Sequence, residues 1–392
     1  MDKRLLEALF VAAFLVLPIV HAQDRGSEWL YMVYLDGDNN LESYGVKDLN
    51  EMELGLASNS GVKVLVLFDG YSGRYIGHKG AKIYEVVHDT SASAVKSKVV
   101  NDLGEVNMGD PSTLTDFVDY CTSNYPASKH ALVLWNHGAG WRELEEERTD
   151  ITKDVCFDDT DGDQLSTEEL SQVLPQISES CGSLDFLGFD ACLMQMFELA
   201  YEYSDSVEVM AGSEETEPGD GWDYSYIMSE LSSDPSMGAE SLGKLAVDAY
   251  ADYYGSDSQV TFSAIRASAV PELASAVSEL SSALLNALPT ERSAISSARN
   301  ASLEFAYSDY IDLYNFAANL RTQDTAVMSA AAGVMDAVDS SMISEWHSSD
   351  YDAHGVSIWF NRTYPSQQYM DRYENLRVSG TGWLDFLLAY YG

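Results

Sequence analysis

Two short apolar runs, each followed closely by a reactive side chain, give the first indication of the fold. They are ALVLW at Ala131–Trp135, which precedes His137, and LDFLGF at Leu184–Phe189, which precedes Cys192. Runs of this length are typical of buried strands. An open α/β sheet collects its reacting groups outside the carboxyl ends of its strands, so we expect His137 and Cys192 to meet there. Their separation of 55 positions suits neighbouring strands joined by a helical crossover.

Further strand and helix patterns alternate along the first half of the chain. Strands are expected at Trp29–Leu35, Val62–Phe68 and Val207–Ala211, and helices at Pro111–Tyr120, Ser166–Leu174 and Leu193–Tyr203. Such alternation indicates an α/β fold with a largely parallel sheet and helices on both faces. Ser166 and Glu169 have the spacing of a capping box, which predicts where one of these helices begins.

The pattern changes after about Gly221. Two stretches rich in Ala, Ser and Leu predict amphipathic helices, and two more strand candidates flank this region. These helices and strands are Leu273–Leu288, Thr325–Val338, Val260–Ala264 and Val356–Phe360, and the chain closes with Trp383–Tyr391. We therefore expect residues 23–221 to form the main core, and residues 222–392 to complete the sheet and add a helical subdomain.

The first 22 residues have the composition of a secretory signal peptide. Lys3 and Arg4 precede an apolar stretch at Leu5–Val20, and small residues suited to cleavage end at Ala22. A membrane anchor is the alternative, but it would need roughly 20 apolar residues. We therefore expect a secreted protein whose mature form has no membrane span.

The chain is strongly acidic. Its 63 Asp and Glu residues outnumber 22 Lys and Arg residues, for a formal net charge of −41. This charge repels nucleic acid and anionic lipid and favours cationic partners by long-range steering. Solubility is the alternative explanation for much of the charge. The sign nevertheless suits a peptide or protein substrate with basic residues.

A thiol and an imidazole at one sheet edge suggest nucleophilic catalysis. Cys192 would attack a carbonyl, His137 would take the thiol proton, and the backbone N–H groups of Gly138 and Cys192 are candidates for the oxyanion site. Each residue alone also has a structural explanation, since buried Cys is a small hydrophobe. The remaining cysteines, Cys121, Cys156 and Cys181, allow one disulfide at most, and the sequence does not assign it.

The segments around these two residues resemble a known family. Trp135–Trp141 (WNHGAGW) and Phe189–Met194 (FDACLM) are similar to the catalytic motifs of clostripain-type cysteine peptidases, family C11 of the caspase-like clan. The resemblance continues in Tyr34–Glu42, Gly219–Trp222 and His354–Ile358. It implies a caspase-like fold, chemistry that needs no cofactor, and a Cys192–His137 dyad that cleaves after Arg or Lys.

The resemblance also implies that Asp190 lies at the base of the pocket for a basic substrate side chain. A partly desolvated carboxylate pairs strongly with a guanidinium, which supports this role. The alternative is that Asp190 caps a helix opening near Ala191. Asp220, flanked by glycines, is a second candidate for substrate contact. Asp36 and Asp38 could lie at the pocket rim, although capping a helix near Leu41 is the preferred interpretation.

The acidic segment Asp158–Asp163 suggests calcium, which fits the calcium dependence implied by the resemblance. An EF-hand is excluded, because Gln164 and Leu170 stand where that loop needs Gly and Glu. A different calcium site remains open, with Asp159, Asp161 and Asp163 as weak candidates for ligands.

The polar interval between the two motifs contains three possible sites of self-cleavage, Arg142, Arg148 and Lys153. His354, which precedes a strand, is expected to be structural. Two alternatives to a basic-specific peptidase remain. One is an inactive secreted protein of the same fold that binds calcium or a partner, and the other is a peptidase that selects Asn or Asp. Nothing in the sequence indicates the oligomeric state.

Overall fold

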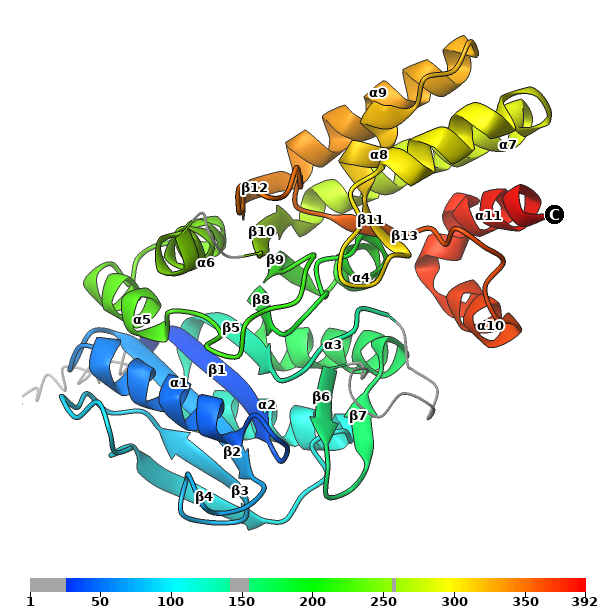
Figure 1. The fold of residues 1–392 in the computed structure, drawn as a ribbon. Coiled ribbons are helices and arrows are strands. Elements are labelled where there is room, and N and C mark those ends of the chain that lie inside the picture. The colour runs from blue at the N-terminus through cyan, green and yellow to red at the C-terminus, as the bar shows by residue number, and fades with distance from the viewer. Residues whose placement is uncertain (1–25, 142–154, 256–258) are drawn as a thin grey trace, which may run out of the picture.

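The computed structural model describes residues 26–141, 155–255 and 259–392, and these residues form an α/β protein (Figure 1). Its main element is a nine-stranded sheet with the strand order β12-β10-β9-β8-β5-β1-β2-β3-β4. The strands are β1 (Ser27–Gly37), β2 (Val62–Gly70), β3 (Gly80–Glu85), β4 (Lys98–Gly104), β5 (Ala127–Trp135), β8 (Leu184–Asp190), β9 (Val207–Gly212), β10 (Thr261–Arg266) and β12 (Met342–His347).

The centre of the sheet is parallel and its two edges are antiparallel. Strands β2, β1, β5, β8 and β9 run in one direction, and each pairs in parallel with its neighbour. Antiparallel strands β3 and β4 extend one edge, while β10 and β12 extend the other. The five strands predicted in the first half of the chain are therefore the parallel centre, and the predicted fold class is confirmed.

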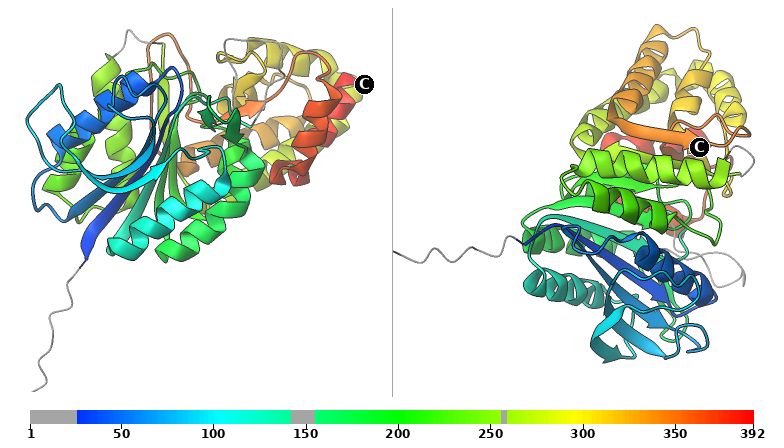
Figure 2. Two further views of the ribbon diagram at one scale, coloured as in Figure 1. Left: turned by 90° about the horizontal axis from the view of Figure 1, so that it is seen from below. Right: turned by 90° about the vertical axis from the view of Figure 1, so that its left-hand side faces the viewer.

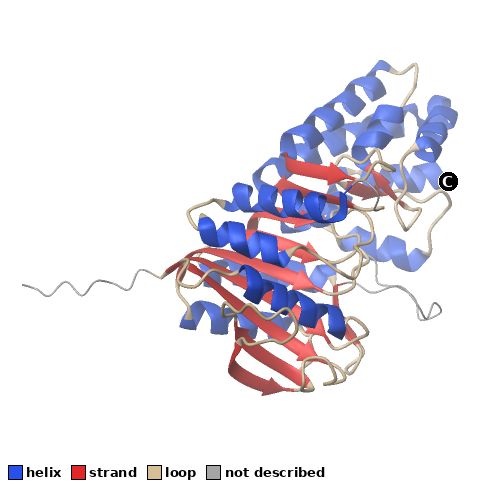
Figure 3. Ribbon diagram, turned by 60° about the vertical axis from the view of Figure 1, so that its left-hand side comes forward, coloured by secondary structure: helices blue, strands red, loops and turns tan. Residues whose placement is uncertain are grey.

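Helices cover both faces of the sheet (Figure 3). The helices of the first two thirds of the chain are α1 (Glu42–Gly55), α2 (Pro111–Asn124), α3 (Thr167–Cys181), α4 (Phe197–Tyr203), α5 (Tyr224–Ser233) and α6 (Ala239–Tyr254). Alternate residues of β1 belong to two separate hydrophobic clusters. Leu30, Met32 and Tyr34 share one cluster with residues of α2, α3 and α4. Tyr31 and Val33 share the other with residues of α1, α5 and α6. Because successive side chains of a strand face opposite sides, each helix layer buries one face.

The last third of the chain adds helices at one end of the sheet, beyond β10 and β12 (Figure 2). They are α7 (Val270–Ala301), α8 (Leu313–Asn319), α9 (Thr325–Ser341), α10 (Gln367–Asn375) and α11 (Trp383–Tyr391), with short 3-10 turns η2 (Ala267–Ala269) and η3 (Arg377–Thr381). Both predicted amphipathic helices lie within longer ones, α7 and α9, which pack against each other. No helix among the described residues is long and apolar enough to cross a bilayer.

Two small sheets lie outside the main one. The candidate strand at Val356–Phe360 corresponds to β13 (Ser357–Trp359), which pairs with β11 (Tyr310–Asp312) rather than with the large sheet. The other small sheet is the hairpin of β6 (Val155–Asp158) and β7 (Asp163–Leu165). This hairpin ends at the predicted capping box, where Ser166 and Glu169 exchange hydrogen bonds at the start of α3.

Candidate active site

Strand pairing brings His137 and Cys192 to the same edge of the sheet. Trp135 at the end of β5 lies opposite Asp190 at the end of β8. His137 and Cys192 each follow two residues later, so both lie just beyond the carboxyl ends of adjacent parallel strands. They line one pocket of about 340 Å³, which also includes Asp190. The structure thus brings together the three residues that the sequence placed at a reaction site.

Gly138 lets the two catalytic segments approach each other closely. A Cβ atom at this position would lie 2.4 Å from the carbonyl oxygen of Cys192 and 3.1 Å from its backbone nitrogen. No side chain fits in that space, because real Cβ atoms do not come within 3 Å of backbone atoms. The backbone amides predicted to form an oxyanion site therefore belong to segments in direct contact.

Three asparagine and aspartate side chains hold the histidine segment. The His137 Nε2 atom lies 2.9 Å from Asn40 Oδ1, and the His137 backbone N–H donates to Asn136 Oδ1. Asn136 Nδ2 donates in turn to the buried Asp36 carboxylate and, at 3.1 Å, to the Phe157 carbonyl. Asn40 was not predicted from the sequence, although it lies inside the motif Tyr34–Glu42; nothing local marks it as a partner of a histidine 97 positions away.

Cys192 is half-buried and has negative charges around it. Its sulfur accepts a hydrogen bond from the backbone N–H of Glu217 at 3.2 Å. Burial, the largest cause, and the nearby charges of Glu217, Glu215 and Asp190 together raise the pKa of the Cys192 thiol to about 12, against the lowering effect of that N–H. The thiol is therefore protonated at neutral pH, and it needs both a base and a change in the local field to react.

The chain turns sharply directly after Cys192. Leu193 has a φ of 65°, a left-handed conformation that costs a non-glycine residue on the order of 1 kcal/mol or more. Its N–H donates to the Glu215 carbonyl at 3.0 Å, and its side chain is buried. The predicted helix start at Leu193 is therefore wrong, since α4 begins only at Phe197.

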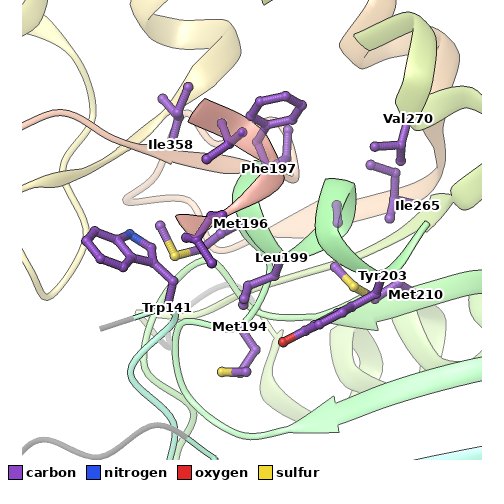
Figure 4. Close-up of a cluster of buried hydrophobic side chains, with 14 of the residues drawn as sticks. Trp141, Met194, Met196, Phe197, Leu199, Tyr203, Met210, Ile265, Val270 and Ile358 are labelled. Atoms are coloured by element: carbon purple, nitrogen blue, oxygen red, sulfur yellow. The ribbon is translucent and has the colours of Figure 1, made fainter. Parts of the chain in front are cut away.

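Hydrophobic packing holds this turn in place. Met194, Met196, Phe197 and Leu199 enter one buried cluster, and Trp141 of the histidine segment lies in the same cluster (Figure 4). Burying a side chain of this size stabilises the fold by about 1.5–3 kcal/mol, which is enough to offset the strain at Leu193. The segments that follow the two predicted catalytic residues are thus held by the same hydrophobic cluster.

Asp190 forms the buried acidic part of the pocket. Its carboxylate accepts hydrogen bonds from the Tyr224 hydroxyl at 2.8 Å and the Trp222 backbone N–H at 3.4 Å. Burial raises its pKa to about 6, although both bonds lower it. Gly221, with a φ of 61°, passes so close that a Cβ there would lie 3.0 Å from the carboxylate. Asp190 ends β8 and no helix opens at Ala191, so the capping alternative is wrong.

Two further carboxylates lie near Asp190, and sequence reasoning did not single them out. Glu217 lines the pocket, and burial together with the charge of Asp190 raises its pKa. Asp48 of α1 is buried and accepts a hydrogen bond from Trp135 Nε1 at 2.8 Å; burial and the same charge raise its pKa. The sequence gives no strong signal for either, because Asp48 lies on an ordinary helix and Glu217 is one of several acidic residues in its loop.

The other predicted acidic positions lie elsewhere. Asp220 is half-exposed, forms an ion pair with Lys47 at 2.9 Å, and does not line the pocket. Asp36 and Asp38 do not cap α1, so that interpretation is wrong. The helix starts after Leu41 without a side-chain cap, and the Leu41 N–H donates to Asn39. Asp36 is instead buried beneath Asn136.

The predicted metal ligands are spread over an exposed turn. Asp158–Asp163 connects β6 and β7, and only Asp158 joins carboxylates from other segments. The exposed side chains are Asp159, Asp161 and Asp163. The signal peptide at residues 1–22 and the three predicted sites of self-cleavage, Arg142, Arg148 and Lys153, lie outside the described residues.

The remaining candidates have structural surroundings. His354 stacks on Tyr314 with ring centroids 4.0 Å apart and lies 3.5 Å from Asp312, away from the pocket. All four cysteines, including Cys192, are free, so no disulfide joins Cys121, Cys156 or Cys181.

A cysteine and a histidine in one crevice of an α/β sheet, beside a buried carboxylate, match the arrangement of a thiol nucleophile and its base. The model of the clostripain family, a peptidase family, matches residues 33–389. The chain therefore belongs to the clostripain family, as the two motifs suggested.

Individual relatives agree with this assignment. Clostripain of Hathewaya histolytica is 30% identical over 233 residues, which make up 53% of this chain and 43% of that protein. The match thus spans less than half of the relative's length. A secreted C11 cysteine protease from Bacteroides thetaiotaomicron, solved with an irreversible peptide inhibitor, has a TM-score of 0.65 at 20% identity and covers 93% of this chain and 99% of its own. An inactive zymogen C11 protease from Parabacteroides distasonis has a TM-score of 0.67 at 18% identity, with coverages of 91% and 99%. These likenesses confirm the caspase-like fold.

Proposed function

We propose that the protein is a secreted endopeptidase that cleaves peptide bonds after arginine or lysine. The proposal depends mainly on one observation: His137, Cys192 and the buried Asp190 line a single pocket at the carboxyl edge of the sheet. Peptidases of this family need no cofactor for the chemistry. Every reacting group can therefore come from the chain itself.

The proposed reaction proceeds through an acyl-enzyme. His137 takes the thiol proton of Cys192 as the sulfur attacks the scissile carbonyl carbon. The N–H groups of Gly138 and Cys192 stabilise the oxyanion that forms. His137 then gives the proton to the leaving amine, the C–N bond breaks, and a thioester remains. A water molecule that loses a proton to His137 hydrolyses this thioester, which releases the acid and regenerates the thiol.

Asn40 has a positioning role in this scheme. If the His137 Nε2 atom carries a hydrogen, that N–H donates to Asn40 Oδ1, and Nδ1 is then the nitrogen that accepts the thiol proton. A neutral amide fixes the tautomer and the ring orientation without adding charge.

The acidic pocket would both select a basic substrate side chain and activate the Cys192 thiol. A guanidinium or ammonium group beside Asp190 gains a charge-assisted hydrogen bond in a desolvated site. The same cation opposes the negative field that raises the pKa of Cys192. Binding of a basic side chain therefore favours thiolate formation, whereas an Asn or Asp side chain would not have this effect and an Asp would be repelled.

Self-processing is a second part of the proposal. Cleavage would follow Arg142, Arg148 or Lys153, in the interval between His137 and Cys192. Intact-mass analysis of the purified wild type beside Cys192→Ala tests it. A fragment pair in the wild type alone supports self-cleavage, and the same cut in both proteins contradicts it.

Fluorogenic peptides that end in Arg or Lys test the catalytic proposal. Wild type should release the fluorophore, while Cys192→Ala and His137→Ala should lose nearly all activity. Matched peptides ending in Asn or Asp should stay intact. A folded wild type that is inert toward all four peptides, with and without calcium, would instead favour the inactive binding protein considered above.

A further inference from the structure

Asp190 and Glu217 place two carboxyl groups in the pocket that contains Cys192. Asp190 is buried, and so are both carboxyl oxygens of Glu217. The two side chains lie within hydrogen-bonding reach of each other. Two carboxyl groups this close in a desolvated site do not both ionise at neutral pH without a cation. The pair therefore keeps one proton while the pocket is empty of a basic side chain.

The groups that face the pair do not replace this proton with a lysine or arginine charge. Lys47 of the neighbouring helix α1 is held by Asp220 at 2.9 Å and by Glu51 at 3.4 Å. The other titratable groups around the two carboxyls are Tyr31 of β1, Asp48 of α1, Tyr224 of α5, Tyr250 and Tyr254 of α6, and Cys192 and His137 in the pocket. Of these only His137 can carry a positive charge, and it belongs to the catalytic pair.

The hydrogen bonds around the pair assign the proton to Glu217. Asp190 accepts from the Tyr224 hydroxyl at 2.8 Å and from the Trp222 N–H at 3.4 Å, and both bonds favour its ionised form. Neither carboxyl oxygen of Glu217 accepts a well-formed hydrogen bond among the described residues. Burial and the charge of Asp190 raise the pKa of Glu217, against smaller lowering effects of Trp222 and the Ala191 N–H. The Glu217 O–H therefore donates to the Asp190 carboxylate.

Asp48 is the other carboxyl group close enough to compete for this role. A Cβ atom at Gly221 would lie 3.0 Å from the Asp190 carboxylate and 3.2 Å from that of Asp48. Asp48, however, accepts a hydrogen bond from Trp135 Nε1 at 2.8 Å, and it acts on Asp190 through charge rather than through a hydrogen bond. Glu217 is thus the carboxyl group that bonds to Asp190.

The backbone of Glu217 contacts the sulfur of Cys192. Its N–H donates to Cys192 Sγ at 3.2 Å. The loop is fixed two residues earlier, where the Glu215 carbonyl accepts from the Leu193 N–H at 3.0 Å and Glu215 Oε2 accepts from the Tyr351 hydroxyl at 2.9 Å. A negative charge on Glu217 would raise the pKa of the Cys192 thiol, so a protonated Glu217 also spares the thiol one opposing charge.

We propose that Glu217 is a positioning residue that works in its protonated form: its O–H holds the Asp190 carboxylate in the orientation that receives a basic side chain, while its N–H holds the Cys192 sulfur. The identity of that side chain rests on the proposed function, whereas the hydrogen bond between the two carboxyl groups does not. Glutamine at position 217 keeps a neutral donor, and methionine keeps the length of the side chain without one. These two substitutions therefore separate the donor from the mere filling of space.

Infrared difference spectroscopy detects the proton directly. The full chain is used as Cys192→Ala, so that neither catalysis nor self-cleavage affects the result. At neutral pH, adding Glu217→Gln should remove the carbonyl stretching band of one protonated carboxylic acid. Glu230→Gln, at an exposed glutamate of α5, is the matched control, and no such band should disappear, because solvated glutamates are ionised at neutral pH.

The binding of arginine amide tests the positioning role. In the Cys192→Ala background, affinity should fall at acid pH as Asp190 takes up a proton. Glu217→Met removes a donor to the ionised Asp190, so this acid limb should move to higher pH by about one unit, whereas Glu217→Gln should leave it in place. In the active enzyme, kcat/KM for an Arg peptide should stay within a few-fold in Glu217→Gln and fall about tenfold in Glu217→Met, mainly through KM.

Three results would overturn the proposal. One is an infrared spectrum in which Glu217→Gln removes no acid band. Another is an acid limb that stays in place in Glu217→Met. The third is a limb that moves to lower pH in either variant, because Glu217 would then be a repelling charge; Glu217→Gln alone decides this point if Glu217→Met does not fold. Arginine amide that binds to none of the proteins would count against the proposed function, whereas the infrared result needs no ligand, so the two failures are distinguishable.

Discussion

The molecule contains two buried groups of carboxylates that differ in access. Asp190 and Glu217 line the open pocket beside Cys192. The closed group lies beneath the edge, has three buried members, and consists of Asp38, Asp69, Glu105 and Asp158. Asp190 receives hydrogen bonds from Tyr224 and Trp222, so it tolerates the absence of a cation, whereas the Asp69 carboxylate has no side-chain donor among the described residues. The open group is thus suited to a transient cation such as a substrate side chain, whereas the carboxylates around Asp69 do not line that pocket.

The largest effect should come from removing the charge of the open group. Asp190→Asn should lower kcat/KM for an Arg substrate by about 10²–10⁴-fold, because loss of one member of a buried ion pair costs about 3–5 kcal/mol. Steady-state kinetics on Arg peptides measure this. Asp220→Asn is the matched control, and its effect should stay within a few-fold, because Asp220 is half-exposed and already paired with Lys47. Equal losses in both variants would contradict the assignment of the pocket.

Sequence patterns predicted the open group better than the closed one, for a physical reason. The five parallel strands are continuous apolar runs, and the reactive residues follow them directly, so His137 and Cys192 could be located from local pattern, whereas the pocket role of Asp190 was implied by the family resemblance. Asp69 lies inside a strand and Glu105 just after another. Only the order of strands in the sheet brings them together, and no local spacing reveals that order.

Two errors in the prediction have similar causes. Apolar spacing at Leu193–Tyr203 predicted a helix, but the need to bury Leu193 in a turn beside Cys192 overrides that pattern. Asp36 and Asp38 precede a helix, so capping was the expected role by sequence. Their actual contacts, with Asn136 and Thr160, are 100 and 122 positions away. Long-range contacts decided both cases.

Asn40 contacts His137 at the open pocket, and its loss should have the next largest effect. Asn40→Ala removes the contact to His137 Nε2, so kcat should fall by about 10–100-fold with little change in KM. Asn40→Asp is the informative companion, since a carboxylate keeps the acceptor and should retain more activity. A rise in KM with kcat unchanged would show that Asn40 binds substrate and does not position the base.

The charge state of the open group should make ligand binding depend on pH. Asp190 binds a cation only when ionised, and its pKa is raised to about 6, so affinity should fall as pH drops through that value. Below it the loss approaches about tenfold per pH unit, as expected for one required ionisation. Glu217, Asp48 and Tyr224 face the same carboxylate, so the observed titration belongs to the group as a whole.

Calorimetry measures the binding of an arginine amide to Cys192→Ala from pH 4 to 8. Because this variant lacks the thiol, the titration of the carboxylates is separated from that of the catalytic pair. Asp190→Asn in the same background should bind weakly with a flatter profile. A Cys192→Ala profile that does not change between pH 7 and pH 5 would mean that another carboxylate holds the cation.

The smallest expected effect tests whether a cation beside Asp190 changes the reactivity of the Cys192 thiol. Burial and negative charges raise the pKa of Cys192 to about 12, and a guanidinium beside Asp190 opposes the second cause. Saturating agmatine should therefore speed alkylation of Cys192 by iodoacetamide a few-fold. Slower alkylation with agmatine would mean that the ligand merely covers the thiol, and the open pocket would then select substrates without activating the enzyme.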